Sequence, residues 1–530
     1  MMLKEILNGC DYTGSMQDSG TVMDTDIPGI AYDSRNVRDG YLFVAIKGET
    51  VDGHDFIKAA IENGAIAVVH EHGIGDSVMQ NPDMHSAPCF ISVKDSKRAL
   101  ACISNNFYQR PSESLTLIGI TGTNGKTTTT YILKSILESW GQHVGLIGTI
   151  QYMIKDSVYP ALHTTPESPE FQSLLRTMDI SGCTHVISEV SSHALAQYRV
   201  DNAVFNTAVF TNLTRDHLDF HQSMENYFRA KERLFAELLD QNGTSVINSD
   251  DPYGRRLISE LKASNSELDI LTYGIETGAD IIASDIDNSF EGLRFKILFK
   301  GKRYDIVSPL MGIPNVYNVL SAAGAAISIG VPWDVISEGI GKTGRIAGRF
   351  EKVNEGQAFL CIIDYAHTED ALERLISTAR EILPPPQPPI VKDGHKGGGN
   401  SSLISHPPSV ITVFGCGGDR DRGKRPGMGE IATRLSDFVI ITSDNPRSEG
   451  PMNIIKDIED GAAGNNYLIE PDRRAAISKA VEMADDGDVV LIAGKGHEDY
   501  QEIQGVRYTF SDRDVLREVI SNRLKMKHTQ

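Results

Sequence analysis

The residues with the clearest chemistry lie in the glycine-rich stretch TGTNGKTTT, residues 121–129. Gly122 and Gly125 let the backbone approach a ligand closely, and the N–H groups of the loop and of a following helix can face an anion. Lys126 offers a charge for outer phosphates, and Thr127 offers a hydroxyl for Mg²⁺. The strict pattern G-x-x-x-x-G-K-[ST] fails, because position 120 is isoleucine. The placement between an apolar run and a helical pattern still favours nucleotide binding over a purely structural turn.

Acidic and imidazole side chains follow two other apolar runs. Glu189 ends THVISE, and Asp216, His217 and Asp219 follow NTAVFTN. The carboxyl ends of parallel strands gather on one edge of a sheet, where ligands bind, so we expect Glu189 and His217 near the phosphate loop. A capping role for Glu189 is an equally good interpretation. His217 and His221 have a spacing found in zinc helices, but no glutamate completes H-E-x-x-H, which disfavours zinc.

A third candidate is the stretch SDNPRSE, residues 443–449, which follows the apolar run DFVIIT. Pro446 has a fixed φ and would stiffen the loop that presents Arg447. A guanidinium held in this way suits a carboxylate, which it can bind through two parallel hydrogen bonds. The simpler alternative is a surface turn in which Arg447 pairs with Glu449.

Alternating strand and helix patterns must position these residues. Apolar runs begin near 115, 143, 184 and 206 and again near 359, 409, 437 and 488, and helical periodicity covers 127–141, 223–242, 368–383 and 472–484. Such alternation predicts mainly parallel sheets with helices on both faces. Ser223 is the expected N-cap of the helix over 223–242. Linker-like stretches at 107–115 and 341–353 predict domains 1–112, 113–344 and 345–530.

Residues 384–409 form an insertion without periodicity. Seven prolines and four glycines stand in these 26 residues, and such a composition buries too little apolar surface to order itself. We expect a solvent-exposed, dispensable loop, in preference to a ligand for a proline-binding domain.

Charge and composition exclude several classes of protein. The chain has 51 Lys and Arg against 71 Asp and Glu, a net charge of −20, which argues against binding to nucleic acid or to a membrane surface. No apolar run is long enough to span a membrane, and the N-terminal stretch lacks the layout of a signal peptide. Six scattered cysteines suggest reduced thiols. We therefore expect a cytoplasmic monomer that binds small molecules.

Taken in order, the motifs resemble the Mur ligase family, the ATP-dependent amide-forming enzymes of peptidoglycan synthesis. The resemblance rests on GITGTNGKTTT, TTPES, EVSSHAL, NLTRDHLDFH, RAKERLF, GIPNVYNVLSAAGA, GRFE, DYAHTEDAL, VFGCGGDRDRGKRPGMG, SDNPRSE and AGKGHEDYQ, which span residues 119–501. It implies an α/β, three-domain architecture. An N-terminal domain would bind the UDP-muramoyl substrate, a central P-loop-type domain would bind ATP, and a C-terminal Rossmann-like domain would bind the incoming amino acid.

The resemblance also implies a reaction. ATP would phosphorylate the γ-carboxylate of UDP-N-acetylmuramoyl-L-Ala-D-Glu, and the amine of meso-diaminopimelate would attack the acyl phosphate, with Mg²⁺ as cofactor. Three alternatives stay open at this stage: the same reaction with L-lysine, a folylpolyglutamate synthetase, and a catalytically silent nucleotide-binding or scaffold protein.

Site roles follow from the resemblance residue by residue. The implied ATP contacts are Gly122, Thr123, Asn124, Gly125, Lys126, Thr127, Thr128, Asn318, Arg349 and Asp364, with His367 where the C-terminal domain closes over the nucleotide. The implied UDP-muramoyl-dipeptide contacts are Ser34, Thr164, Thr165, Ser191, Gln197 and Arg199, with further contacts at residues 49–51. The implied diaminopimelate contacts are Arg420, Asp444, Asn445, Pro446, Arg447, Gly494 and Glu498.

The implied metal ligands are Thr127, Glu189, His217 and a carbamylated Lys231. Carbamylation would convert the lysine into an anion that can hold a second Mg²⁺. Lys126, Lys231, His217 and Glu189 form the implied catalytic set.

Overall fold

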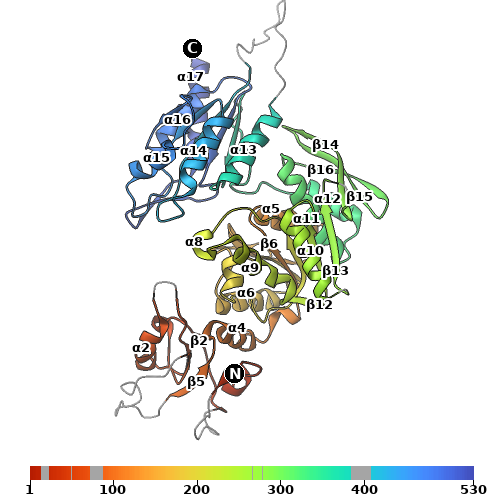
Figure 1. Ribbon diagram of the computed structural model, residues 1–530, viewed down its shortest axis with the longest axis vertical. Helices are drawn as coiled ribbons and strands as arrows, with labels where there is room; N and C mark the ends of the chain where they lie inside the picture. The colour runs from red at the N-terminus through yellow and green to blue at the C-terminus, as the bar shows by residue number, and fades with distance from the viewer. Residues whose placement is uncertain are drawn as a thin grey trace, which may run out of the picture.

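The computed structural model describes residues 1–13, 23–48, 51–71, 88–265, 267–276, 278–383 and 407–529. Three sheets, each with its own helices, follow one another along the long axis of the molecule (Figure 1). Most of the predicted insertion at 384–409, and positions 49 and 50 of the expected contact at 49–51, lie outside the described residues. In the described part, no helix combines the length and apolarity that a membrane span requires.

The N-terminal sheet has five strands in the order β1-β5-β4-β3-β2. They are β1 (Tyr12–Thr13), β2 (Ile30–Ala31), β3 (Leu42–Val44), β4 (Ala67–His70) and β5 (Cys89–Val93). The helices α1 (Leu3–Ile6) and α4 (Ser96–Phe107) pack their apolar residues into one core, and α2 (Ile57–Glu62) packs into a second. Asp95 caps α4 by accepting hydrogen bonds from the N–H groups of Lys97 and Arg98.

One prediction fails in this domain. The structure pairs Cys10 with Cys102 of α4 in a disulfide, with the two Cα atoms 5.7 Å apart, so the expectation of six free thiols is wrong for these two. The cysteines are 92 residues apart in sequence, and only the packing of the N-terminal segment on α4 brings them together. Among the described residues, Cys89, Cys183, Cys361 and Cys416 are free.

The central sheet has 11 strands in the order β16-β15-β14-β13-β12-β11-β6-β10-β7-β8-β9. They are β6 (Thr116–Thr121), β7 (Val144–Ile147), β8 (Gln151–Ile154), β9 (Ser157–Pro160), β10 (His185–Glu189), β11 (Phe205–Phe210), β12 (Leu239–Asn248), β13 (Asp269–Gly274), β14 (Ile281–Ser289), β15 (Gly292–Phe299) and β16 (Lys302–Ser308). The seven neighbouring strands β14-β13-β12-β11-β6-β10-β7 pair in parallel, as predicted. The antiparallel extension β14–β16 was not predicted, although 281–308 alternates apolar and polar residues.

Helices cover both faces of this sheet. On one face lie α5 (Lys126–Ser139), α11 (Ile313–Ser328) and α12 (Trp333–Gly341), and on the other α6 (Ser168–Ile180), α7 (Ser192–Ala196), α9 (Met224–Ala236) and α10 (Pro252–Ser264). Ser223 caps α9 as predicted, by accepting a hydrogen bond from the N–H of Asn226. The predicted helix over 223–242 is too long, because α9 ends at Ala236 and strand β12 begins at Leu239.

The C-terminal sheet has six strands in the order β17-β18-β22-β19-β20-β21. They are β17 (Glu351–Val353), β18 (Leu360–Asp364), β19 (Val410–Phe414), β20 (Phe438–Ile441), β21 (Tyr467–Ile469) and β22 (Val489–Ala493). One face carries α13 (Glu369–Ile382), α14 (Lys424–Leu435) and α15 (Pro451–Glu459), and the other α16 (Arg473–Met483) and α17 (Asp512–Thr529). Because β22 inserts between β18 and β19, the strand order reverses there, which marks a ligand-binding crevice at the carboxyl ends.

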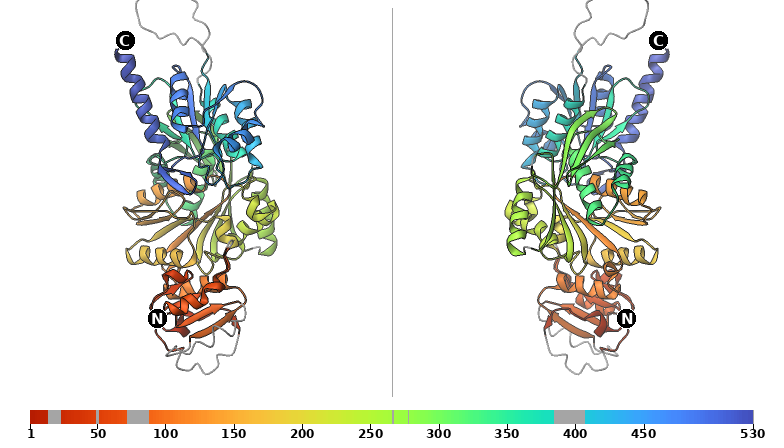
Figure 2. Two further views of the ribbon diagram at one scale, coloured as in Figure 1. Left: turned by 90° about the vertical axis from the view of Figure 1, so that its left-hand side faces the viewer. Right: turned by 90° about the vertical axis from the view of Figure 1, so that its right-hand side faces the viewer.

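The central and C-terminal domains face each other through the loops that follow their parallel strands. The short helix α8 (Leu218–His221) and the start of α5 lie at this junction, and α13 approaches it from the C-terminal domain (Figures 1 and 2). The gap between Gly341 at the end of α12 and Glu351 at the start of β17 contains the predicted boundary at 344/345. The exact boundaries stay predictions.

Candidate active site between the central and C-terminal domains

The phosphate loop links β6 to α5 and needs glycine at two positions. Gly122 has φ +143°, and a Cβ there would lie 1.9 Å from Oγ1 of Thr211. Gly125 has φ +89°, and a Cβ there would lie 2.4 Å from Oδ1 of Asn318, a residue of α11. The loop is therefore packed on two sides, by Thr211 and by Asn318. This packing fixes the N-terminal end of α5, where an anion can bind.

Two lysine side chains meet at one carbonyl of this loop. The Nζ atoms of Lys126 and Lys231 both donate to the Gly122 carbonyl oxygen, at 2.9 and 2.8 Å. Burial lowers the pKa of Lys231 well below its ordinary value, and the nearby charge of Lys126 lowers it further. Burial also lowers the pKa of Lys126. Two ammonium groups this close repel each other, so the arrangement favours an anion, or a neutral or modified Lys231.

Glu189 ends β10 beside the phosphate loop and is completely buried. Its carboxylate accepts hydrogen bonds from Oγ1 of Thr127 at 2.9 Å and from N and Oγ1 of Thr149, both at 2.9 Å. Nη2 of Arg349 reaches the same Thr127 hydroxyl at 3.2 Å from the C-terminal side. The prediction that Glu189 lies at the phosphate loop agrees with this geometry, and the residue caps no helix here.

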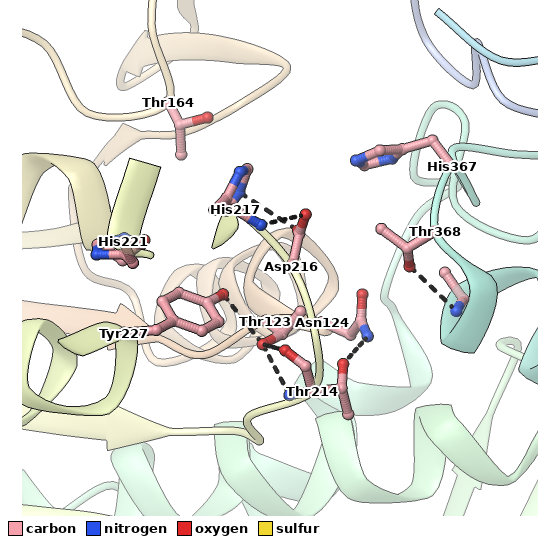
Figure 3. Close-up of polar contacts among 12 residues, drawn as sticks. Thr123, Asn124, Thr164, Thr214, Asp216, His217, His221, Tyr227, His367 and Thr368 are labelled. Carbon is pink, nitrogen blue, oxygen red and sulfur yellow. Dashed lines mark hydrogen bonds and ion pairs between the residues drawn. The ribbon is translucent and has the colours of Figure 1, made fainter. Parts of the chain in front are cut away.

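His217 and Asp216 lie between the phosphate loop and His367 of the C-terminal domain (Figure 3). Nε2 of His217 is 3.3 Å from Oδ2 of Asp216, and its ring centroid is 4.7 Å from that of His193. Burial lowers the pKa of His217 to about 3, so its imidazole is neutral, as a metal ligand requires. His221 instead contacts Ser192, with 2.9 Å between Nε2 and Oγ.

The residues fit Mg²⁺ in part. Thr127 and Glu189 place a hydroxyl and a carboxylate side by side, and such oxygen ligands suit this cation. In the part of the chain that the structure describes, no group of three or more His, Cys, Asp or Glu could hold a metal ion. His217 lines the same cleft as Thr127 and Glu189, whereas Lys231 contacts the Gly122 carbonyl oxygen and would offer an anionic ligand only if carbamylated.

A cleft of about 290 Å³ joins these residues to the C-terminal domain. Asn318, Arg349, Asp364, Tyr365 and His367 line it together with the phosphate loop. Asp364 ends β18, and its Oδ2 accepts a hydrogen bond from the N–H of Phe350 at 2.6 Å. The guanidinium of Arg349 lies 4.9 Å from the ring centroid of Tyr365, and Nε of Arg349 has no hydrogen-bond partner among the described atoms. The implied ATP residues therefore surround one cavity, with an orphaned donor that a ligand can satisfy.

The implied UDP-muramoyl-dipeptide residues adjoin the same cleft at β10. Thr165 Oγ1 donates to the Glu189 carbonyl oxygen at 2.7 Å, and Arg199 Nη1 donates to the Thr165 carbonyl oxygen at 3.1 Å. Thr164 and Ser191 line the cleft itself. Ser34, also in this set, is buried in the N-terminal domain, in the 3₁₀ turn Ser34–Asn36. The set therefore spans two domains.

The SDNPRSE loop follows β20 and is held by the hairpin β23 (Tyr500–Ile503) and β24 (Val506–Thr509). Arg447 has φ +51°, its N–H donates to the Glu502 carbonyl oxygen at 3.0 Å, and its carbonyl oxygen accepts from the N–H of Gln504 at 2.7 Å. Its Nη1 donates to the carbonyl oxygen of Gly418 at 2.7 Å. The loop is thus stiffened by backbone pairing as well as by Pro446.

The alternative pairing of Arg447 with Glu449 is wrong. Glu449 binds Arg425, a fully buried residue of α14, at 2.7 Å, and Glu449 also accepts a hydrogen bond from the N–H of Asp419.

Two of the implied ligand contacts, Asn445 and Glu498, form hydrogen bonds within the protein. The Asn445 amide donates to Glu498 at 2.7 Å and accepts from Lys495 Nζ at 3.1 Å. The side chain of Asn445 is therefore held in place by Glu498 and Lys495.

The remaining implied contacts follow the carboxyl ends of β19, β20 and β22. Asp444 is buried, and a Cβ on Gly494 would lie 2.6 Å from its Oδ2. Arg420 is exposed, and its Nη1 donates to the Asp419 carbonyl oxygen at 3.1 Å. Burial raises the pKa of Glu498, which nevertheless stays paired with Lys495.

One residue at the junction was missed. Oδ2 of Asp370, at the start of α13, accepts hydrogen bonds from Nδ2 of Asn124 at 2.9 Å and from Oγ1 of Thr214 at 3.2 Å. This carboxylate joins the C-terminal domain directly to the phosphate loop. The sequence DYAHTEDAL contains it, but spacing alone does not show that a residue of one domain reaches a loop of another.

Comparisons with known proteins agree with this architecture. Residues 26–108 match the model "Mur ligase family, catalytic domain", 120–326 "Mur ligase middle domain" and 401–496 "Mur ligase, glutamate ligase domain". The UDP-N-acetylmuramoyl-L-alanyl-D-glutamate–2,6-diaminopimelate ligase of Solibacter usitatus is 45% identical over 94% of this chain and 94% of its own length. The ligase of that name from Caldanaerobacter subterraneus is 43% identical over 94% and 95%. A solved structure of a ligase of that name has a TM-score of 0.67 at 32% identity and covers 99% of both chains. The predicted three-domain α/β fold is confirmed.

Proposed function

Because this chain belongs to the Mur ligase family, we propose that it joins meso-2,6-diaminopimelate to UDP-N-acetylmuramoyl-L-Ala-D-Glu at the expense of ATP. The relatives named above carry this activity in their names, at 43% and 45% identity. The observation that carries the proposal is that two loops follow the carboxyl ends of parallel strands in two neighbouring domains. The phosphate loop with Lys126 follows β6 of the central domain, and the loop that presents Arg447 follows β20 of the C-terminal domain.

The proposed chemistry begins at the phosphate loop. A carboxylate is a poor acyl donor, because its leaving group would be oxide. Transfer of the γ-phosphoryl group of ATP to the D-Glu carboxylate gives an acyl phosphate and ADP. The unprotonated amine of diaminopimelate then attacks the acyl carbon, the C–O bond to phosphate breaks, and the amide loses a proton. The protein's part is positioning and charge stabilisation.

Named side chains supply these effects in the proposal. Lys126 and Arg349 offset phosphate charge, while Asn318 packs against the loop at Gly125. Thr127 and Glu189 would hold Mg²⁺, which when bound neutralises charge on the phosphates. Thr165 and Arg199 orient the peptide end of the nucleotide substrate from the strand end at Glu189.

Lys231 has a separate proposed role as a carbamylated residue. A neutral amine is the form that reacts with CO₂, and burial beside Lys126 favours that form. The modified side chain would place an anion beside Lys126 and remove the repulsion between the two lysines. Intact mass and a ¹³CO₂-labelled carbamate signal that is lost in Lys231→Ala test this; an unmodified Lys231 in bicarbonate-equilibrated protein contradicts it.

The identity of the amino acid rests on Arg447. Diaminopimelate differs from L-lysine by a distal carboxylate, which a guanidinium binds and which lysine lacks. Phosphate release should therefore be measured with UDP-N-acetylmuramoyl-L-Ala-D-Glu and ATP, with either amino acid. Turnover with diaminopimelate well above that with L-lysine supports the proposal. The reverse preference identifies a lysine-adding enzyme, and no release with either contradicts the ligase activity. Since ATP is a cytoplasmic metabolite, we place the enzyme in the cytoplasm.

A further inference from the structure

Tyr198 lies in the loop after α7, between the two implied substrate contacts Gln197 and Arg199. Its φ is +60°, a conformation that is uncommon for a bulky residue and that indicates a constraint from the surroundings. The loop is well connected on one side: Arg199 binds Gln197 at 2.7 Å and Glu167 at 2.7 Å. The loop conformation therefore sets where these side chains can meet a ligand.

Arg233 of α9 holds this loop from within the central domain. Its Nη2 is 2.8 Å from Oδ2 of Asp201, and its Nη1 donates to the carbonyl oxygen of Leu195. The guanidinium carbon lies 4.7 Å from the ring centroid of Tyr198. One arginine thus fixes both ends of the loop and contacts the ring at its centre.

A second guanidinium reaches the same ring from the N-terminal domain. The Arg98 guanidinium carbon, on α4, lies 4.4 Å from the Tyr198 ring centroid. Other polar contacts between these two domains reach α6, or reach Val204 just before β11, whose N–H donates to Oγ of Ser112 at 3.2 Å. Tyr32 donates to Glu170 at 3.2 Å, and Arg176 donates to Gln109 at 2.8 Å. Arg98 therefore contacts the aromatic side chain that stands between Gln197 and Arg199, and its charge also acts on Asp201 at the end of the same loop.

We propose that Arg98 and Tyr198 form a positioning contact that sets the distance between the two ends of the UDP-muramoyl-dipeptide site. The inference rests on the proposed function, in which Ser34 and the loop at 197–199 bind opposite ends of one ligand. A long ligand gains affinity from both ends only when the two half-sites stand at the right spacing. A cation–π contact suits this task because it fixes two surfaces without the strict angles of a hydrogen bond.

The test compares the binding of the whole ligand with the binding of one end. Dissociation constants for UDP-N-acetylmuramoyl-L-Ala-D-Glu and for UDP alone are measured by titration calorimetry in wild type, Arg98→Ala, Tyr198→Leu, Tyr198→Phe and the Arg98→Ala/Tyr198→Leu double variant. Arg256→Ala is the matched control, because Arg256 lies 4.3 Å from the ring centroid of Phe228 within the central domain. Thermal melting checks that each variant is folded.

Arg98→Ala should weaken binding of the whole ligand about two- to five-fold, the value of one exposed cation–π contact. It should leave UDP binding unchanged. Tyr198→Phe should keep wild-type affinity, and the double variant should lose less than the product of the single losses. Unchanged affinity for the whole ligand in Arg98→Ala overturns the inference. A parallel loss of UDP affinity also overturns it, because that result marks general damage to the N-terminal domain.

The binding assay needs neither ATP nor diaminopimelate, which separates this inference from the proposed function. If wild type binds the nucleotide-peptide but adds another amino acid, the proposed function fails and the positioning role stands on its own data. If wild type does not bind the nucleotide-peptide, both are contradicted.

Discussion

Replacing Arg447 by alanine should remove most of the enzyme's use of diaminopimelate. The backbone of residue 447 is fixed by its pairing with Glu502 and Gln504, so truncation should leave the loop in place. One guanidinium nitrogen, Nη1, already donates to the carbonyl oxygen of Gly418, which fixes the orientation of the guanidinium before a ligand binds. A hydrogen bond to a charged group contributes about 1.5–3 kcal/mol, which corresponds to an approximately 10- to 150-fold loss in kcat/KM.

The assay is ATP-dependent phosphate release with saturating UDP-N-acetylmuramoyl-L-Ala-D-Glu and varied diaminopimelate. The KM for ATP should not change, because Arg447 lies outside the ATP cleft. Arg447→Lys keeps the charge but loses the planar fork, so it should recover only part of the loss. Arg507→Ala is the control, since Arg507 is an exposed arginine of the hairpin that holds the Arg447 loop, and it contacts Tyr500 rather than that loop.

Two results would refute the reasoning. Diaminopimelate kinetics within about two-fold of wild type would show that Arg447 does not bind the distal carboxylate, since even a weak charged hydrogen bond exceeds that factor. If the KM for ATP rose by the same factor, the substitution would instead disturb the domain as a whole.

Three further outcomes are expected. Gly122→Ala should weaken ATP binding about ten-fold or more, since the added Cβ would meet Thr211. Gly141→Ala is the control and should leave ATP binding unchanged, because no atom lies within 4 Å of its added Cβ. Equal ATP affinities of the two variants contradict the packing argument. A short Gly-Ser linker in place of residues 384–406 should leave kcat/KM within about two-fold, because we expect these residues to be dispensable and loop length changes the entropy of loop closure only slowly; loss of activity with an intact fold refutes this. Arg425 lowers the pKa of Glu449 to about 2 from an ordinary value of 4.5, so the ionised pair stabilises the fold above pH 4.5 and is lost as the pH falls toward 2. The difference in urea unfolding free energy between wild type and Glu449→Gln should therefore shrink from pH 6 to pH 3, and a constant difference contradicts the assignment.

Local patterns predicted the parts of the fold that depend on neighbouring residues. The run around 115–121 became β6 and the run around 437–442 became β20, because a short apolar segment between loops has few alternatives to a buried strand. The helix after Ser223 was predicted with its N-cap but not with its end. The last residues of the predicted helix, from Leu239 on, form strand β12 instead, because they pair with β11 and β13. Helical periodicity does not reveal such a tertiary contact.

Long-range contacts account for the parts that the sequence did not predict. Cys10 and Cys102 meet only through packing of distant segments, and Asp370 reaches Asn124 across 246 residues. The alternative pairing of Arg447 was plausible on sequence because Glu449 is two residues away. A buried Arg425 from α14 takes that carboxylate instead, because burying a guanidinium requires a charged partner.

The two lysines at the Gly122 carbonyl suggest why so acidic a chain can bind anionic substrates. A net charge of −20 repels ATP at long range, but salt screens that field beyond about 10 Å. At short range a ligand in the cleft meets Lys126 and Arg349, and the buried Lys231 lies behind them at the Gly122 carbonyl oxygen that Lys126 also contacts. Burial lowers the pKa of both lysines because it disfavours their charged forms, and an incoming phosphate or a carbamate on Lys231 would stabilise the charged form of Lys126. The site therefore favours anions because its donor groups, Lys126 and Arg349, are held at the phosphate loop before the ligand arrives, which is the preorganisation that phosphoryl transfer requires.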